Sequence, residues 1–145
     1  MSAESNKTIV RRFFDLYHAK NDDEAEKLID PRAVIHQPGI GDLNMKAFRK
    51  LGEDYRAAFP DGKFTIDELI AEGDNVVARL TYRGTQRGPF QGIPATNRQV
   101  VNPGVWILRF SPDGKVIELW SEYDQLSMLV QLGVMKAPTA ARSMT

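Results

Sequence analysis

The stretch that decides the fold is residues 59–85, which read FPDGKFTIDELIAEGDNVVARLTYRGT. Before this stretch the apolar residues recur at the spacing of a helix, whereas inside it they alternate with polar residues, the period of a strand. The turn sequences PDG (60–62) and GDN (73–75) end the helical part and divide the alternating part in two. Residues 59–85 therefore predict the end of a helix, a sharp turn and two strands.

Upstream of this stretch the pattern predicts three helices and one short strand. Ile9 and Phe13 begin the apolar stripe of a first helix, and residues 23–29 form a short second helix. A strand at 33–37 follows. Asn44 suits the N-cap of a third helix, which continues to the PDG turn.

Downstream of it we expect two more strands and a final helix. The strands cover residues 99–110 and 116–123, and the helix covers 125–132. Asp124 suits the N-cap of that helix, and Gly133 suits the left-handed position that follows its last turn.

This order of elements predicts an α+β fold. Three helices are too few to cover both faces of a sheet built from such a meander of strands. We therefore expect the helices on one face only. A strongly curved antiparallel sheet with helices on its concave side leaves a pocket between the layers, and such a pocket is the default ligand site.

Composition narrows the class of protein. The 145 residues suit one domain, which we place at 1–135, with 136–145 as a disordered tail. The 19 basic and 19 acidic residues are mixed along the chain, so we expect neither nucleic acid nor a membrane as partner. The chain has no cysteine, no apolar run as long as a membrane helix and no signal-peptide pattern at its polar N-terminus, which predicts a soluble cytoplasmic protein.

The sequence predicts neither a metal nor a cofactor. The two histidines, His18 and His36, are far apart and have no second ligand at metal-binding spacing. The glycines follow neither the dinucleotide-binding nor the phosphate-loop pattern. We expect His18 to lie on the solvent side of its helix without a chemical role.

The alternation within the strands indicates which side chains face the pocket. Glu118 and Glu122 require water, so the opposite face of the strand 116–123 points inward. In the same way, Arg109 marks the outer face of the strand 99–110, and the other face of that strand points inward. The inward residues are mainly apolar and aromatic, with a few polar groups among them. The predicted ligand-binding residues are Phe13, Tyr17, Phe59, Tyr82, Asn102, Trp106, Leu119, Ser121 and Tyr123.

Two residues are candidates for acid–base chemistry. His36 follows an apolar strand at the point where that strand enters the predicted pocket, and a histidine there can move protons near neutral pH. A hydrogen-bonded residue at the pocket rim is the alternative. Asp124 ends a pocket strand and is the second catalytic candidate, although its N-cap position explains it without catalysis.

Five phrases of the sequence carry a resemblance to a known family. They are NKTIVRRFFDLYH near the N-terminus, AVIHQP, the stretch 59–85 quoted above, the loop TQRGPFQGIPATNR at 85–98, and GKVIELWSEYDQLSMLVQLG near the C-terminus. In the loop, Thr85, Gly88 and Phe90 begin a pattern that Gly92-Ile93-Pro94 and Thr96 complete. With these phrases the chain resembles the SnoaL-like polyketide cyclase (ester cyclase) family of the NTF2-like superfamily.

The resemblance implies a cone-shaped, cystatin-like α+β barrel, a homodimer or larger oligomer built through the sheet, and no cofactor. In the cyclases that name the family, a pocket aspartate is the general acid and base of an intramolecular aldol ring closure. This sequence has Ser121 at that position, and Leu119 and Trp106 where the family often has histidines. A serine hydroxyl stays protonated without an adjacent base, so His36 is the preferred base here, with Ser121, Tyr123 and Asn102 orienting the substrate.

Two functions stay open. The first is a cofactor-free enzyme that cyclises, isomerises or hydrolyses an apolar, carbonyl-containing or polyketide-like molecule. The second is a non-catalytic protein that binds such a molecule in the same pocket. An epoxide-hydrolase or ketosteroid-isomerase type of enzyme ranks last, because it requires an inward carboxylate and the strand pattern places none.

Overall fold

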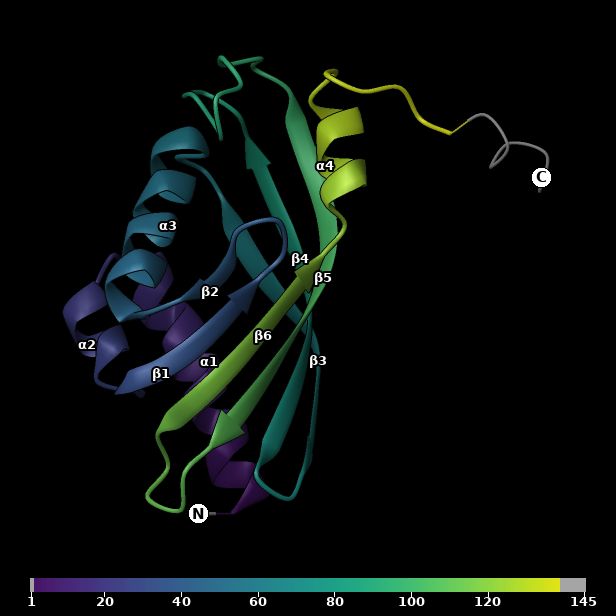
Figure 1. Cartoon of the computed structure of the whole chain (residues 1–145). Helices are drawn as coiled ribbons and strands as arrows, with labels where there is room; N and C mark the ends of the chain where they lie inside the picture. Colours follow the sequence, from purple (N-terminus) through teal and green to yellow (C-terminus); the bar gives the residue numbers. More distant parts are fainter. Residues whose placement is uncertain (1, 139–145) are drawn as a thin grey trace.

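The computed structural model describes residues 2–138, which form four helices and six strands (Figure 1). Of the predicted disordered tail, residues 136–138 have no regular secondary structure and 139–145 lie outside the described residues. The elements in chain order are α1 (Ala3–His18), α2 (Asp22–Glu26), β1 (Ile29–Gln37), β2 (Gly41–Leu43), α3 (Met45–Ala58), β3 (Lys63–Glu72), β4 (Asn75–Thr85), β5 (Gln99–Phe110), β6 (Val116–Tyr123) and α4 (Gln125–Gln131).

Short polar side chains cap the helices, as the sequence predicts. Asn44 accepts a hydrogen bond from the Ala47 amide at 2.9 Å at the start of α3, and Asp124 accepts one from the Ser127 amide at 2.9 Å at the start of α4. Both bonds satisfy an amide that the helix itself leaves without a partner. Gly133 ends α4 with a φ of 81°, the left-handed conformation that glycine adopts at lowest cost.

The six strands form one curved sheet in the order β2-β1-β6-β5-β4-β3. The neighbours from β3 to β6 are antiparallel, and this confirms the predicted meander. The expectation of a wholly antiparallel sheet is wrong at one place, because β1 lies parallel to β6, with Ile35 beside Leu119. In the chain β1 is separated from β6 by β2, α3 and the strands β3 to β5, so no hairpin turn joins the two and sets an antiparallel direction.

The predicted inward faces of β4, β5 and β6 are confirmed. The β4–β5 register is continuous from Gln99 to Arg109, so the glycine and proline inside β5 do not shift it. One shift occurs where Phe110 pairs with Val116. It buries Val116 and leaves Ile117 half-buried, because the bulge at the start of β6 carries one extra residue and interrupts the alternation there.

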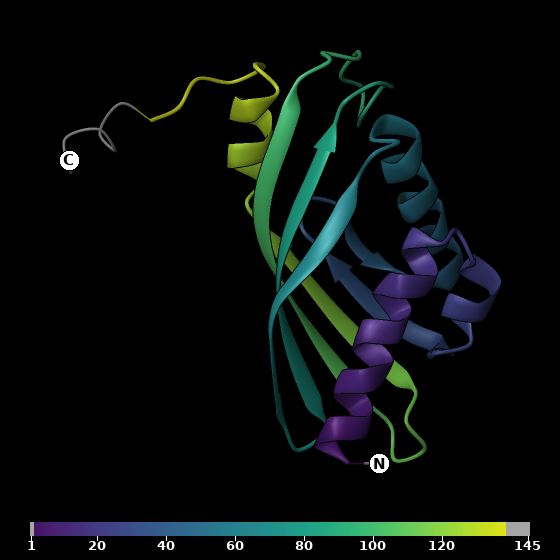
Figure 2. The same cartoon turned by 180° about the vertical axis from the view of Figure 1, so that it is seen from behind.

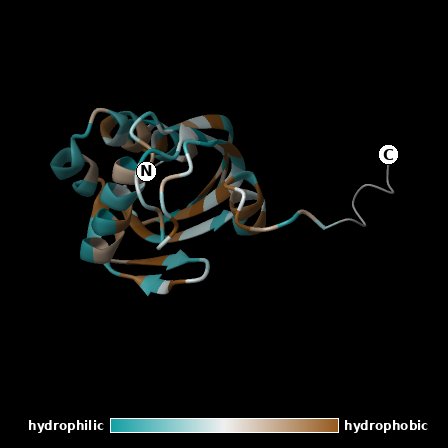
Figure 3. Cartoon of the chain, turned by 90° about the horizontal axis from the view of Figure 1, so that it is seen from above, coloured by the Kyte–Doolittle hydropathy of each residue, from teal (hydrophilic) through white to brown (hydrophobic). Residues whose placement is uncertain are grey.

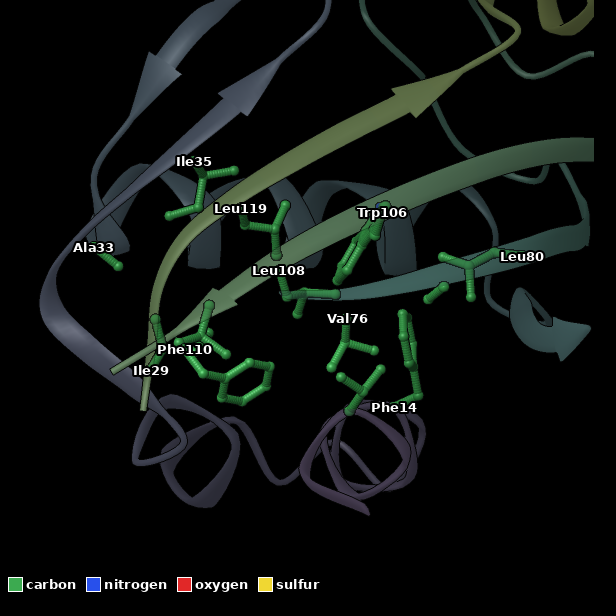
Figure 4. Packing of buried hydrophobic residues seen from close by; sticks show 13 residues of the cluster. Phe14, Ile29, Ala33, Ile35, Val76, Leu80, Trp106, Leu108, Phe110 and Leu119 are labelled. Atoms are coloured by element: carbon green, nitrogen blue, oxygen red, sulfur yellow. The ribbon is translucent and has the colours of Figure 1, made fainter. Parts of the chain in front are cut away.

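The helices α1, α2 and α3 cover the concave face of the sheet (Figures 1 and 2). On α1, Val10 and Phe14 lie one turn apart and point at the sheet, where the rings of Phe14 and Trp106 are 4.9 Å apart. Figure 4 shows this core, which fills the space between α1 and the strands. Seen from above, hydrophobic residues gather on the surfaces that the helices and the sheet turn toward each other (Figure 3).

The long loop between β4 and β5 is organised by one buried amide. Gln86 donates from Nε2 to the carbonyls of Gly88, Ile93 and Pro94, and its Oε1 accepts two hydrogen bonds from Thr96. This loop carries Phe90 into a second core cluster against α3. Residues 86–98 of this loop contribute nothing to the pocket described below. The part of the family pattern that lies there therefore serves the fold.

Candidate functional site

A pocket lies between the concave face of the sheet and the helices α1, α2 and α3. The space inside it that no protein atom fills, its open mouth included, amounts to about 1010 Å³. The predicted pocket between sheet and helices is therefore present.

Aromatic side chains form one continuous part of the pocket wall. The rings of Phe13 and Trp106 are 5.9 Å apart, and Phe48 lies 6.3 Å from Phe13 and 6.1 Å from Trp106. Phe64 and Tyr82 continue this wall with ring centres 4.7 Å apart. Such a wall favours a flat, apolar ligand, because stacking and the release of water both contribute to its binding.

Several buried polar atoms in residues 2–138 have no hydrogen-bond partner, and most belong to residues that line this pocket. These atoms are Asn6 Oδ1, Arg56 Nε, Asn102 Oδ1 and the Tyr123 hydroxyl. Of their residues, all but Asn6 line the pocket. Buried polar groups almost always find partners, so unsatisfied ones gathered at one pocket indicate a place where a ligand supplies the missing partner.

Three phenols of the pocket, those of Tyr17, Tyr55 and Tyr82, keep their protons at neutral pH. Burial raises the pKa of Tyr17 to about 12 and raises the pKa of Tyr82 further above its usual range. Burial also holds the pKa of Tyr55 well above its ordinary value, and the neighbouring Tyr123 raises it further. Their hydroxyls can therefore donate hydrogen bonds, and none of these three is an ionised base at neutral pH.

Ion pairs between α2 and α3 lie at the pocket mouth formed by these two helices, where Asp22, Glu26 and Arg56 belong to the lining. Arg56 binds both carboxylate oxygens of Asp22 and lies 4.3 Å over the ring of Tyr17. The hydrogen bond from Arg56 lowers the pKa of Asp22. Arg49 reaches Asp23 at 3.0 Å and Glu26 at 3.3 Å. The carboxylates at the mouth are thus occupied by arginines.

The structure places most of the predicted ligand-binding residues in the pocket. Those that line it are Phe13, Tyr17, Tyr82, Asn102, Trp106, Ser121 and Tyr123. Phe59 and Leu119 do not, and both are corrections to the predicted set. Phe59 is 1% exposed and packs between Tyr82 and Phe90, while Leu119 is 1% exposed in the main core.

The prediction that His36 faces the pocket is wrong. In β1 the inward residues are Ile35 and Gln37, so alternation turns His36 to the outer face of the sheet. There its Nδ1 lies 2.7 Å from Asp42 and its Nε2 lies 2.7 Å from Glu118. These two carboxylates raise the pKa of His36, and the residue is no base for this pocket.

Asp124 also lies outside the pocket lining, and its carboxylate is occupied as the N-cap of α4. Its predicted catalytic role in this pocket therefore has no support in the geometry.

The other histidine differs from its prediction as well, because His18 is half-buried and its Nε2 accepts a hydrogen bond from the Phe64 amide at 3.0 Å. His18 thus ties α1 to β3.

The sequence interpretation missed Gln37, Phe48 and Tyr55, which line the pocket. A signal for each was present. Gln37 shares the face of Ile35, and Phe48 and Tyr55 lie on one apolar stripe of α3.

Among residues 2–138, no group of three or more histidine, cysteine or acidic side chains could hold a metal ion. None of the helices described there combines the length and apolar character needed to cross a bilayer.

The sequence model that describes the family of SnoaL-like polyketide cyclases matches residues 7–132, which is most of the chain. The chain belongs to this family. The strand order and the helices over the concave face are thus those of a SnoaL-like, NTF2-like fold, as the sequence resemblance implies.

Solved structures of SnoaL-like architecture resemble this one closely. AclR of Streptomyces galilaeus, described as a proposed hydroxylase, is 27% identical with a TM-score of 0.86 over 99% of this chain and 90% of its own. TsrD of Streptomyces laurentii is 27% identical with a TM-score of 0.83 over 93% of this chain and 99% of its own. IdmH of Streptomyces antibioticus, a proposed polyketide cyclase, is 28% identical with a TM-score of 0.79 over 89% of this chain and 99% of its own.

A comparison with curated protein sequences gave no significant match. The solved structures carry names for different reactions, so the SnoaL-like fold alone does not select the chemistry. The residues of the pocket must do so. Ser121, at the position where the resemblance implies the cyclase aspartate, is 4% exposed and lines the pocket wall.

Proposed function

We propose that this SnoaL-like protein binds an apolar molecule with a carbonyl group and promotes its cyclisation or isomerisation without a cofactor. The observation that carries the proposal is the pairing of an aromatic wall with unpartnered polar atoms on Asn102 and Tyr123. A carbonyl that enters the pocket can accept a hydrogen bond from the Tyr123 hydroxyl, and a hydroxyl of the same ligand can donate one to Asn102 Oδ1. Hydrogen bonds of this kind stabilise the enol or enolate through which such reactions pass.

A second candidate function is binding without conversion. The observation that favours it is the chemistry of the lining in the described part of the chain, which includes no histidine. Its carboxylates are Asp22 and Glu26, which are paired with arginines, and Glu122, whose residue is exposed. Any base must therefore come from the mouth, from water or from the ligand itself.

One experiment separates the two functions. The purified protein is incubated in deuterated buffer with methyl naphthyl ketone and with an aryl diketone, and exchange of the hydrogens next to the carbonyl is followed by NMR. Exchange or ring closure faster than in buffer supports the enzyme. Binding without either supports the binding protein, and failure of both compounds to bind contradicts the proposed pocket. Thr81→Val, which removes a hydroxyl from the outer face of β4, serves as the control variant.

The predicted oligomer belongs to the same proposal. The family resemblance supports a homodimer built through the sheet, and sedimentation of the purified chain tests it.

A further inference from the structure

A second, smaller cavity lies next to the pocket. It is bounded by α1, by the start of β1 and by the inward faces of β5 and β6. Phe13, Ile29 and Trp106 line both the pocket and this cavity. The two spaces are therefore neighbours that these shared residues separate.

The strand register gives the order of the two spaces along the sheet. On the inward face of β5, Asn102 and Gly104 line the pocket. Trp106 lines both spaces, and Leu108 lines the cavity (Figure 4). Gly104 pairs with Tyr123, and Leu108 follows four residues later, about 14 Å along an antiparallel strand. The polar end of the pocket and the cavity thus lie at opposite ends of one path.

Among residues 2–138, only apolar side chains line the cavity. Leu108 and Leu119 bound it on the sheet, and Val10 bounds it on α1. Ile9 and Leu28 also line it and are half-buried, so they mark its outer side. Its space, any opening included, amounts to about 230 Å³. Protein interiors are otherwise close-packed and apolar cavities stay dry, so an apolar group that enters gains contacts without displacing bound water.

Phe13 is the residue most able to open the boundary between the two spaces. It is half-buried, whereas Ile29 and Trp106 are buried. The ring of Phe13 is inclined by 49° to that of Trp106, so the two rings are not stacked flat. A rotation of the Phe13 side chain can therefore join the cavity to the pocket while the strands stay in place.

We propose that the cavity is a subsite for a short alkyl group, which the ligand carries at the end of its ring system that faces away from its carbonyl. The proposal rests on the proposed function and adds the shape of the ligand to it. The carbonyl lies at the Tyr123 end, the rings lie along Trp106, and the alkyl group passes Phe13 to reach Leu108. The subsite binds the alkyl group by burial alone and takes no part in the chemistry.

The test compares two isomeric ketones, whose affinities for the whole chain are measured by calorimetry relative to methyl 2-naphthyl ketone. Methyl 6-ethyl-2-naphthyl ketone carries its ethyl group away from the carbonyl, whereas propyl 2-naphthyl ketone carries the same two carbon atoms beside it. Burial of one CH₂ group is worth roughly fourfold in affinity. We therefore expect the 6-ethyl ketone to bind roughly fifteenfold more tightly than the methyl ketone, and more tightly than its isomer.

A matched pair of variants locates the ethyl group. Val116→Ile adds one methyl group to the wall of the cavity, so it should reduce the advantage of the 6-ethyl ketone over the methyl ketone to less than about fourfold. Val77→Ile adds the same group on the outer face of β4 and should leave that advantage as in the wild type. Each advantage compares two ligands on one protein, so a general loss of affinity cancels.

A 6-ethyl ketone that binds the wild-type chain no more tightly than its isomer overturns the subsite, and this measurement needs no variant to fold. An advantage that persists in Val116→Ile overturns it too, because the ethyl group then lies elsewhere. If the methyl ketone binds and the ethyl group brings no gain, the subsite is wrong and the proposed function stands. If none of the three ketones binds, the proposed function itself fails.

Discussion

The two faces of the sheet treat polar side chains in opposite ways. On the outer face, His36 lies between Asp42 and Glu118, and Glu118 also accepts a hydrogen bond from Arg109 at 3.1 Å. On the inner face, Asn102 and the Tyr123 hydroxyl lack partners in the described structure. The polar groups of the outer cluster find their hydrogen-bond partners within the chain, whereas the inner groups need a ligand as their partner. Titratable residues alone would therefore have pointed to the wrong face.

The largest expected difference between the faces concerns the two tryptophans. Trp106 is buried in the core and the pocket wall, whereas Trp120 stacks on His36 at the outer face with ring centres 5.2 Å apart. We expect Trp106→Ala to lower the free energy of unfolding by about 3–5 kcal/mol, because it leaves a cavity. Trp120→Ala should cost about 1 kcal/mol, since it loses mainly surface stacking. Urea titration measures both, and equal losses would contradict the assignment of faces.

The next effect separates binding from stability at one residue. Asn102→Leu removes an amide that the folded chain leaves unsatisfied, so the free energy of unfolding should stay equal or rise. The affinity for 1-naphthol, whose hydroxyl can donate to Asn102 Oδ1, should fall about tenfold, the loss of one hydrogen bond. Calorimetry measures the affinity and chemical denaturation the stability. An Asn102→Leu protein that is less stable and binds as wild type would show that the amide serves the fold.

A smaller effect is expected at Asp124, the second catalytic candidate of the sequence. Asp124→Ala removes the N-cap of α4 and should lower the free energy of unfolding by about 1 kcal/mol. Asp124→Asn, which can still cap the helix, should retain wild-type stability. Both variants should bind and convert ligand as wild type does. Loss of conversion in a folded Asp124→Asn protein would restore the catalytic role of the carboxylate.

The smallest effects concern the two histidines, whose pKa values shift in opposite directions. Asp42 and Glu118 raise the pKa of His36 above 6.5, so its stabilising contribution is complete below pH 6.5 and disappears as the pH rises through the raised pKa. Burial beside Lys63 lowers the pKa of His18, so its contribution is lost as the pH falls below 6.5.

Proton NMR of the imidazole resonances checks this prediction directly. His36 should titrate above pH 6.5 and His18 below it, and His36→Gln and His18→Gln assign the two curves. Removal of Arg109, the cation that shares Glu118 with His36, should raise the pKa of His36 further. A reversed order of the two histidine pKa values would contradict the partners assigned to them.

Local signals made much of the fold predictable. Asn44 and Asp124 are N-caps in the sequence and in the structure, because the capping bond depends only on neighbouring residues. Alternation along β4, β5 and β6 placed Tyr82, Trp106 and Ser121 on the inner face, since each strand has charged residues to mark the other side. The parallel pairing of β1 with β6 has no such local signal.

The candidate site was predictable only where the strand pattern was long. In β1 the apolar residues Ala33 and Ile35 mark the inner face, so alternation places His36 on the outer face. The prediction followed the ability of imidazole to move protons instead of this short pattern, and it was wrong for that reason. Phe59 and Leu119 face inward but are covered by other side chains, and covering depends on the whole packed chain. The unpartnered state of Asn102 could not be foreseen, because it requires knowing every neighbour.

The most direct test of the inner face is the carbon-13 NMR shift of methyl naphthyl ketone labelled at its carbonyl and bound to the protein. If the Tyr123 hydroxyl donates to that oxygen, the resonance moves downfield on binding to the wild-type chain and returns toward its value in an apolar solvent with Tyr123→Phe. A bound carbonyl with the shift of an apolar solvent in the wild-type protein would contradict the account.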